Sequence, residues 1–300
     1  MAKKINIIEK GLKWQNILAP KINHREIAHP VDKVLVNVLE KIHINDLLNT
    51  AMEKMVITQY GTMLATGIVL DEKNFPEIYK SLKEIAQLLG INIPYTVISN
   101  SMQGINAFAT GTDENPFIVI SNTAPLVLNP DELKFILAHE CGHVAMEHMV
   151  YHTAGTLAAS MGGYVPVFGP IVSNVAVFPL NYWNRCSEIT ADRIGFLCCG
   201  NLEVSQRALL KIIGGLTDVS EVDIKQYISQ SRKFQNMQVL GRLGEYMQSH
   251  PMIYKRLLAL EYFANSELYF KVTGKTPPTD TKIYTTSQLN DRINEMLSIM

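Results

Sequence analysis

The stretch NPDELKFILAHECGHVAMEHMV, residues 129–150, predicts a helix with an unusual density of titratable side chains. Asn129 can accept hydrogen bonds as an N-cap, Pro130 suits the first helical turn, and Glu132 is placed for a capping box. Apolar residues then recur at helical spacing. We therefore expect a helix that begins near residue 130.

His139 and His143 are four residues apart on this helix, so their rings project from the same face. Two ring nitrogens at this spacing can bind one metal ion, and Zn²⁺ favours such ligands. Glu140 lies beside such an ion and suits a general base that acts on water. The motif H-E-x-x-H thus indicates zinc-assisted hydrolysis, with an ordinary pair of hydrogen-bonded histidines as the alternative.

A catalytic zinc usually takes a third protein ligand and leaves one position to water. Glu147 shares the histidine face, but on a straight helix it lies about 12 Å from His139 along the axis, too far for one ion. We therefore expect Glu147 to be an outer or solvated residue. His148 and His152 are rotated away from that face, and we expect both at the surface.

A better candidate for the third ligand lies in NRCSEITADRIGFLCC, residues 184–199. Glu188 and Asp192 are four apart on an expected helix, which is mildly destabilising unless a cation lies nearby. In one interpretation Glu188 binds the ion and Asp192 accepts the outer N–H of a ligand histidine. In the other, both carboxylates pair with Arg185 and Arg193 on a solvated face. The spacing alone does not choose between them.

Several segments together resemble peptidase family M48, the gluzincin metallopeptidases in which H-E-x-x-H is followed by E-x-x-x-D on a later helix. HECGH (139–143) and EITAD (188–192) resemble these two motifs, and NAFATG (106–111) resembles the family's N-A-[FY] edge strand. HPMIYKR (250–256) resembles its H-P-x-x-x-x-R segment. The similarity runs from about residue 95 to 260, with the motifs in the family's order.

This resemblance implies one catalytic zinc ion per chain. His139, His143 and Glu188 would ligate the ion, and Glu140 would be the general base. Asp192 would accept a hydrogen bond from the outer nitrogen of a ligand histidine.

The resemblance also implies how substrate is held. Asn106, with Ala107 and Phe108 on the same edge strand, would bind an extended peptide through its backbone. His250 and Arg256 would reach the site from the C-terminal side, where either could act in catalysis by stabilising the oxyanion of the tetrahedral intermediate. Alternatively, His250 caps the zinc and keeps the enzyme latent, or simply begins a helix.

We expect an α+β fold, a mostly helical zincin-like metallopeptidase with a small antiparallel sheet that borders the active-site cleft. Helical periodicity covers 31–55 and 74–90. Strand-like segments at 93–99, 106–110 and 117–121 supply three strands.

The domain organisation follows from length and composition. Three hundred residues, of which 47% are hydrophobic, can bury one large core. We expect a single metallopeptidase domain over 1–273, with a helical N-terminal part at 1–90 and a catalytic core at 91–265. A linker and a C-terminal amphipathic helix occupy 274–300.

Charge and cysteine content narrow the partners and the compartment. A net charge of −1 without a dense Lys/Arg block argues against nucleic acid and leaves a peptide or protein as the expected partner. The N-terminus lacks the apolar core of a cleaved secretory signal. The four cysteines form no C-x-x-C pair, which favours a reducing compartment. We therefore expect a cytoplasmic protein.

Residues 154–180 carry no charge and exceed the length that spans a bilayer. Three prolines and four glycines interrupt the segment, and no basic cluster flanks it to set an orientation. We favour a buried helical hairpin or a substrate-facing loop. Peripheral or integral membrane contact is the alternative.

Taken together, these features predict a zinc-dependent endopeptidase that cleaves peptide bonds with activated water and Glu140 as base. Two other classes remain as alternatives. One is a catalytically latent, zinc-containing binding or chaperone-like protein of the same fold. The other is a different zinc hydrolase, of the deformylase or esterase type.

Overall fold

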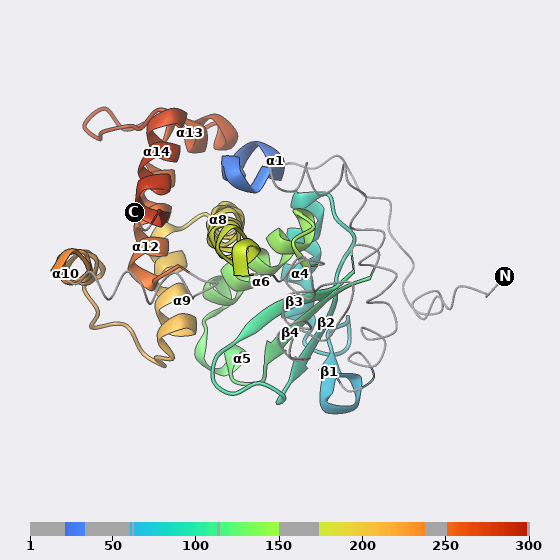
Figure 1. Ribbon diagram of the computed structural model, residues 1–300. Coiled ribbons are helices and arrows are strands. Elements are labelled where there is room, and N and C mark those ends of the chain that lie inside the picture. Colours follow the sequence, from blue (N-terminus) through green and yellow to red (C-terminus); the bar gives the residue numbers. More distant parts are fainter. Residues whose placement is uncertain are drawn as a thin grey trace.

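The computed structural model describes residues 22–33, 61, 63–112, 115–149, 174–237 and 251–298 (Figure 1). The helices are α1 (His24–Ile27), α4 (Pro76–Leu89), α5 (Ala124–Val127), α6 (Pro130–Ala145), α8 (Asn174–Cys199), α9 (Leu202–Gly214), α10 (Ile224–Met237), α12 (Ile253–Ala264), α13 (Glu267–Thr273) and α14 (Thr286–Leu297). The strands are β1 (Gly67–Val69), β2 (Tyr95–Ser99), β3 (Ala107–Gly111) and β4 (Pro116–Ser121). This mostly helical chain with one small sheet confirms the expected α+β class.

Some predictions fall on other parts of the chain. Most of the expected helix at 31–55, most of the uncharged segment 154–180, and both His152 and His250 lie outside the described residues. Within the described part, no helix is both long enough and apolar enough to cross a bilayer.

The sheet differs from the expected three-stranded antiparallel one. Its strand order is β1-β2-β4-β3, and β2 pairs with β4 in parallel, Tyr95 facing Phe117. The pairs β1–β2 and β3–β4 are antiparallel. The prediction of a purely antiparallel sheet was therefore wrong. Every residue of β4 is buried, so this strand takes a central place, and β3 folds back along its outer side.

The two faces of the sheet carry cores of different size. On one face α4 and α6 pack, and the large helical core includes Ile118 and Ile120 of β4 (Figure 1). Ala107 and Ala109 of β3 also face this core, and their small side chains let α6 lie close to the strand. On the other face a small cluster includes Phe108. The edge strand β3 thus lies directly against the helix that carries the histidines.

The start of α6 is held as the sequence predicts. The side chain of Asn129 accepts hydrogen bonds from the backbone N–H groups of Asp131 and Glu132, and Glu132 accepts one from the N–H of Asn129 at 2.9 Å. This reciprocal capping box satisfies donors that a helix start leaves unpaired. Lys211 of α9 also contacts the Glu132 carboxylate at 2.8 Å, which ties α9 to the same end of α6.

Two glycines lie where α6 and α8 cross. A Cβ on Gly142 of α6 would lie 3.3 Å from the Cα of Ala191, and a Cβ on Gly195 of α8 would lie 3.0 Å from the carbonyl oxygen of Phe135. Any larger residue would therefore force the helices apart. This close approach brings Glu188, one turn before Asp192 on α8, up to the histidines of α6.

The C-terminal helices close the other side of α8. Helix α12 packs against both α8 and α9 and carries Arg256 toward the site. The C-terminal amphipathic helix expected in 274–300 is α14, which buries Leu289, Ile293 and Leu297 completely and packs against α12 and α8.

Candidate active site

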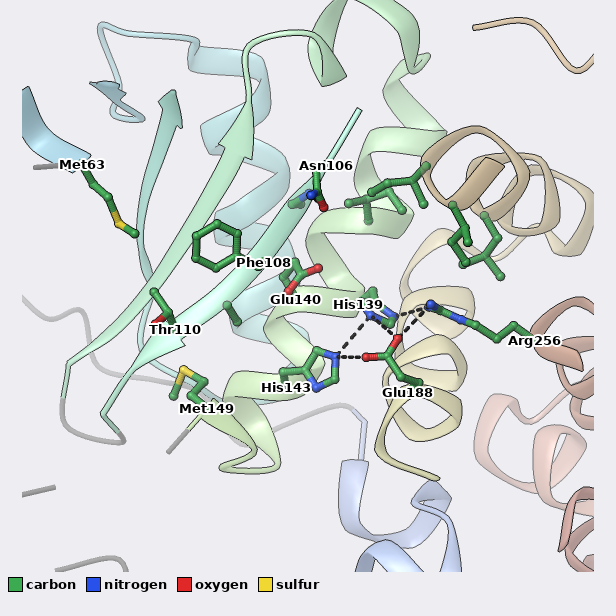
Figure 2. Close-up of a pocket in the computed structure, with 16 residues that line it drawn as sticks. Met63, Asn106, Phe108, Thr110, His139, Glu140, His143, Met149, Glu188 and Arg256 are labelled. Atoms are coloured by element: carbon green, nitrogen blue, oxygen red, sulfur yellow. Dashed lines mark hydrogen bonds and ion pairs between the residues drawn. The ribbon is translucent and has the colours of Figure 1, made fainter. Parts of the chain in front are cut away.

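The three residues predicted as metal ligands lie together at the crossing of α6 and α8 (Figure 2). Nε2 of His139 is 3.2 Å from Nε2 of His143. The two carboxylate oxygens of Glu188 lie 3.6 Å from the first nitrogen and 3.5 Å from the second. All three side chains are buried. Glu147 does not join this cluster, as its distance along the helix predicts.

These distances fit one zinc ion. Tetrahedral ligands at about 2.1 Å from zinc stand about 3.4 Å from one another. The three observed separations lie close to that value, and the donors are two imidazole nitrogens and a carboxylate, which zinc prefers. Three carboxylates, those of Glu140, Glu188 and Asp192, lie near the single guanidinium of Arg256. A divalent cation would balance this buried negative charge.

Nδ1 of His139, the ring nitrogen that points away from the ligand cluster, contacts the ion pair of Asp192 and Arg256. Nδ1 of His139 is 3.0 Å from Oδ1 of Asp192. Arg256 of α12 donates to both oxygens of Asp192, at 2.7 and 2.6 Å, and its Nη1 lies 2.8 Å from Glu188. Glu188 and Asp192 are only 3% and 1% exposed, so the alternative of a solvated acidic face is wrong.

The prediction that His148 lies at the surface was wrong. His148 is completely buried, and its Nδ1 is 2.9 Å from Nδ1 of His143. The prediction assumed that the helix continues through this residue, whereas α6 ends at Ala145. Behind His148 lies Asp32, 2.9 Å from its other nitrogen. Sequence reasoning missed Asp32 because no motif or spacing marks it.

Glu140 is buried on the cleft side of α6. Burial raises the pKa of its carboxyl group, and the nearby charge of His139 opposes that rise. The backbone N–H of Ala109 on β3 donates a hydrogen bond to the same carboxyl group. A carboxylate whose pKa is raised accepts a proton more readily, which is the property a general base needs.

The remaining site groups titrate according to burial and to the ion pair. Burial lowers the pKa of His143 to about 4. Burial also lowers the pKa of His139, but the hydrogen bond and charge of Asp192 outweigh it and raise this pKa above the usual value. For Asp192, burial raises the pKa, and the charge of Arg256 outweighs it and brings the pKa below the usual value.

A cleft of about 600 Å³ opens beside the cluster. Its walls come from β3, α6 and α9, and His139, Glu140 and Glu188 line it (Figure 2). Asn106 and Phe108 line the cleft as well, on the side of the edge strand.

The predicted substrate residues Asn106, Ala107 and Phe108 therefore all border the cleft. The side chain of Asn106 accepts a hydrogen bond from the N–H of Ala107 at 2.9 Å. Its backbone N–H donates to Oγ of Ser121 at 3.0 Å, which fixes the start of β3. Arg256 also borders the cleft, and its contacts there are with the two carboxylates and His139.

A ligand set of this kind, with a buried glutamate next to it and a sheet edge along the cleft, is typical of metallopeptidases. Sequence comparison agrees. The model of peptidase family M48 matches residues 72–264, which is more than half of the chain. The chain belongs to peptidase family M48, and it is therefore a metal-dependent peptidase with peptides or proteins as substrates.

Curated relatives carry the same assignment. The chain is 26% identical over 259 residues to the plastoglobule-localized metallopeptidase 48, chloroplastic, of Arabidopsis thaliana, covering 81% of this chain and 74% of the relative. It is 25% identical over 241 residues to a protease HtpX homolog of Gemmatimonas aurantiaca, covering 70% of this chain and 82% of the relative. It is 26% identical over 220 residues to protease HtpX homolog 1 of Streptomyces coelicolor, covering 64% of this chain and 72% of the relative. No solved structure matches the chain.

Proposed function

We propose that this protein is a zinc-dependent endopeptidase, with one zinc ion per chain held by His139, His143 and Glu188. The observation that carries the proposal is the set of separations of 3.2, 3.5 and 3.6 Å among their donor atoms, close to those of tetrahedral zinc ligands. Bound zinc would lower the pKa of a water molecule toward 7 and polarise the peptide carbonyl.

The protein's own groups then handle the proton. Glu140 accepts a proton from the attacking water and later passes it to the departing amine. The rise in its pKa caused by burial favours the first transfer. The second transfer is favourable because the departing amine is much more basic than the carboxylate. The N–H of Ala109 keeps the carboxyl group turned toward the cleft wall.

The strand β3 supplies the substrate track. Within the described part of the chain it pairs only with β4, so its other edge, apart from the N–H of Ala109 that bonds Glu140, can accept an extended peptide as an additional strand. Strand addition holds residues on both sides of the cleaved bond, which an endopeptidase requires. Asn106, Ala107 and Phe108 form the start of this track and border the cleft.

Helix α9 supplies an apolar wall. Leu209, Ile212 and Ile213 line the cleft, together with Ile136 of α6. We therefore expect a preference for peptides with an apolar side chain next to the cleaved bond, because its burial there is favourable.

Arg256 has an orienting role in this proposal. Its three short contacts lock Asp192 and Glu188, and thereby His139, in place. Stabilisation of the oxyanion by Arg256 or by His250 stays a prediction.

The decisive test replaces Glu140 by Gln. The amide keeps the shape of the side chain but cannot take the proton, so kcat on casein should fall roughly 10²- to 10⁴-fold. Metal analysis should find the same zinc content as in the wild type. Glu77→Gln, an exposed position on α4, is the matched control and should leave both quantities unchanged.

Two outcomes would contradict the proposal. Wild-type turnover in Glu140→Gln would remove the general base. A wild-type protein that holds zinc but cleaves neither casein nor long peptides, with or without added metal, would favour a latent zinc-containing binding protein. Assays with ester and formyl-peptide substrates separate peptidase activity from other zinc hydrolases.

A further inference from the structure

A second chain of buried groups stands behind His143, on the side away from the cleft. Nδ1 of His143 lies 2.9 Å from Nδ1 of His148, and Nε2 of His148 lies 2.9 Å from Oδ1 of Asp32. His148 and Asp32 are both fully buried. The indole N–H of Trp183 on α8 donates to the same oxygen of Asp32 at 2.9 Å.

The order of donors and acceptors along this chain follows from metal binding. If His143 offers the lone pair of Nε2 to the ion, its Nδ1 carries the hydrogen and donates to Nδ1 of His148. His148 then carries its own hydrogen on Nε2 and donates to the carboxylate of Asp32. One arrangement of neutral rings thus satisfies every contact and leaves the ligand nitrogen turned toward the metal.

The backbone places His148 where this contact is made. After α6 ends, the N–H of His148 bonds to the carbonyl of His143 at 3.0 Å, and the N–H of Glu147 bonds to that of Val144 at 3.1 Å. This pair of bonds is a Schellman motif, with Glu147 in the left-handed region at φ 59°. Glycine usually occupies that position, so the turn is kept despite some backbone strain. His148 is therefore linked to His143 through both backbone and side chain.

Asp32 comes from a distant part of the chain. It follows α1, and the family match begins only at residue 72. Two hydrogen bonds attach the segment 22–33 to α8. The N–H of His29 donates to Oγ1 of Thr190 at 3.0 Å, and Arg193 donates to the carbonyl of Ile27 at 2.7 Å. These contacts hold Asp32 at its place behind the histidines.

We propose that His148, itself held in place by Asp32, is a positioning residue of the metal centre that keeps the ring of His143 in the tautomer and orientation that bind zinc. The inference rests on the proposed function only in that His143 binds zinc. It assigns to the segment 22–33 a role in metal binding. Outer partners of this kind typically change metal affinity 10- to 100-fold when removed.

Two amide substitutions of His148 test the proposal. In His148→Asn the side-chain oxygen takes the place of Nδ1 and still accepts from His143, while the contact with Asp32 is lost. In His148→Gln the amide reaches the place of Nε2 and still meets Asp32, while the contact with His143 is lost. The zinc dissociation constant is measured by competition with a chromophoric chelator, and the Tm of the metal-free protein is measured in parallel.

Zinc affinity separates the two variants. His148→Gln should weaken zinc binding roughly 10- to 100-fold, whereas His148→Asn should keep the zinc dissociation constant within a few-fold of wild type. The Tm of the metal-free protein should fall by a similar amount in both variants, because each loses one buried hydrogen bond, at His143 in the Gln variant and at Asp32 in the Asn variant. Cobalt substitution adds a spectroscopic check, since a reoriented His143 changes the visible absorption bands of the ion in the Gln variant.

Other outcomes overturn the proposal. If zinc affinity and Tm fall together in both variants, or if the Gln variant binds zinc like the wild type, the pair has only a structural role. A wild-type protein that binds zinc without cleaving peptides contradicts the proposed function but leaves this inference standing. Should either variant fail to fold, His148→Phe, which keeps a ring but makes neither contact, replaces it, and an unchanged cobalt spectrum and zinc affinity in that variant count against the proposal.

Discussion

His139 and His143 stand one turn apart on α6, yet their outer nitrogens are supported from opposite ends of the chain. His139 rests on Asp192, which Arg256 of α12 grips with two hydrogen bonds. His143 rests on His148, which in turn contacts Asp32 in the segment after α1. The first support is a charged pair, and the second is a chain that begins with the imidazole ring of His148.

This difference shows two ways of holding a ligand in a buried site. On the charged side, the two hydrogen bonds from Arg256 offset the cost of burying the Asp192 carboxylate. Arg256 also contacts Glu188, so this support acts on two ligands at once. The second support acts on one ligand alone and depends on a backbone turn for its geometry. Substitutions on the two sides should therefore have different signatures.

The largest effect should come from removing a ligand itself. His143→Ala deletes the ligand nitrogen and the contact with His148 in one step. Zinc affinity should fall by more than the roughly 100-fold that loss of an outer partner costs, and peptide cleavage should disappear with it. Metal analysis after dialysis measures the occupancy, with Glu77→Gln at an exposed position of α4 as the control. Full occupancy in His143→Ala would falsify the ligand assignment.

The charged support is broken by Arg256→Lys. Lysine keeps the positive charge but cannot bond both oxygens of Asp192 and also reach Glu188, so buried carboxylates lose partners. The free energy of unfolding should fall by about 3 kcal/mol, and zinc affinity should fall about tenfold. Urea unfolding and zinc competition measure the two quantities. Loss of affinity with a fall in stability of only about 1 kcal/mol, as for one lost hydrogen bond, would make the two supports alike.

The crossing of α6 and α8 sets the distance between the two histidines of α6 and the carboxylates of Glu188 and Asp192 on α8. Gly195→Ala places a methyl group against Phe135, which moves the helices apart and should cost about 1–3 kcal/mol of stability. Gly214→Ala at the end of α9 is the control, since a Cβ there meets only ordinary contacts at 3.6 Å. Equal thermal stability of the two variants would contradict the role of the crossing.

The smallest effect concerns His29, three residues before Asp32. Burial, aided by the charge of Arg193 and opposed by that of Asp32, lowers the pKa of His29 from 6.5 to about 3. At a pH between about 3 and 6.5, His29 binds a proton in the unfolded chain but not in the folded one. The free energy of unfolding therefore decreases as the pH falls below 6.5.

We expect the stability advantage of the wild type over His29→Asn to be about 1 kcal/mol smaller at pH 5.5 than at pH 7.5. Asparagine retains an acceptor where Nδ1 of His29 meets the N–H of Val31. Urea unfolding at the two pH values measures the difference, and the two proteins share every other titrating group. Parallel pH profiles would show that His29 is not held neutral in the folded state.

Local patterns predicted the elements that carry the chemistry. The capping residues at 129–132 mark the start of α6, and the four-residue spacing of His139 and His143 puts both rings on one face. The helix that carries Glu188 and Asp192 was also expected. These features depend on residues within one or two helical turns, and short-range geometry alone is enough to derive them.

Order in the sheet was not predictable in the same way. Strands were expected at 93–99, 106–110 and 117–121, and they form at 95–99, 107–111 and 116–121. Their pattern of side chains does not show which strand takes the centre. Burial of all of β4 decides this, and it depends on helices that come later in the chain.

Prediction failed at the support of His143 for a different reason. The position of His148 was inferred from an unbroken helix, and the turn at Glu147 breaks it within two residues. No residue type marks this turn, because glycine is absent from it. Asp32 lies 116 positions away in sequence from its partner, and only folding brings them together.

The sequence by itself determined the chemistry of the site, since residue types at helical spacing suffice to name two imidazoles, a base and a pair of carboxylates. The tertiary structure alone decided which carboxylates support which ligand, because those contacts join segments far apart in the chain. Their selection depends on which helices pack closely enough, and close packing is a property of the whole core.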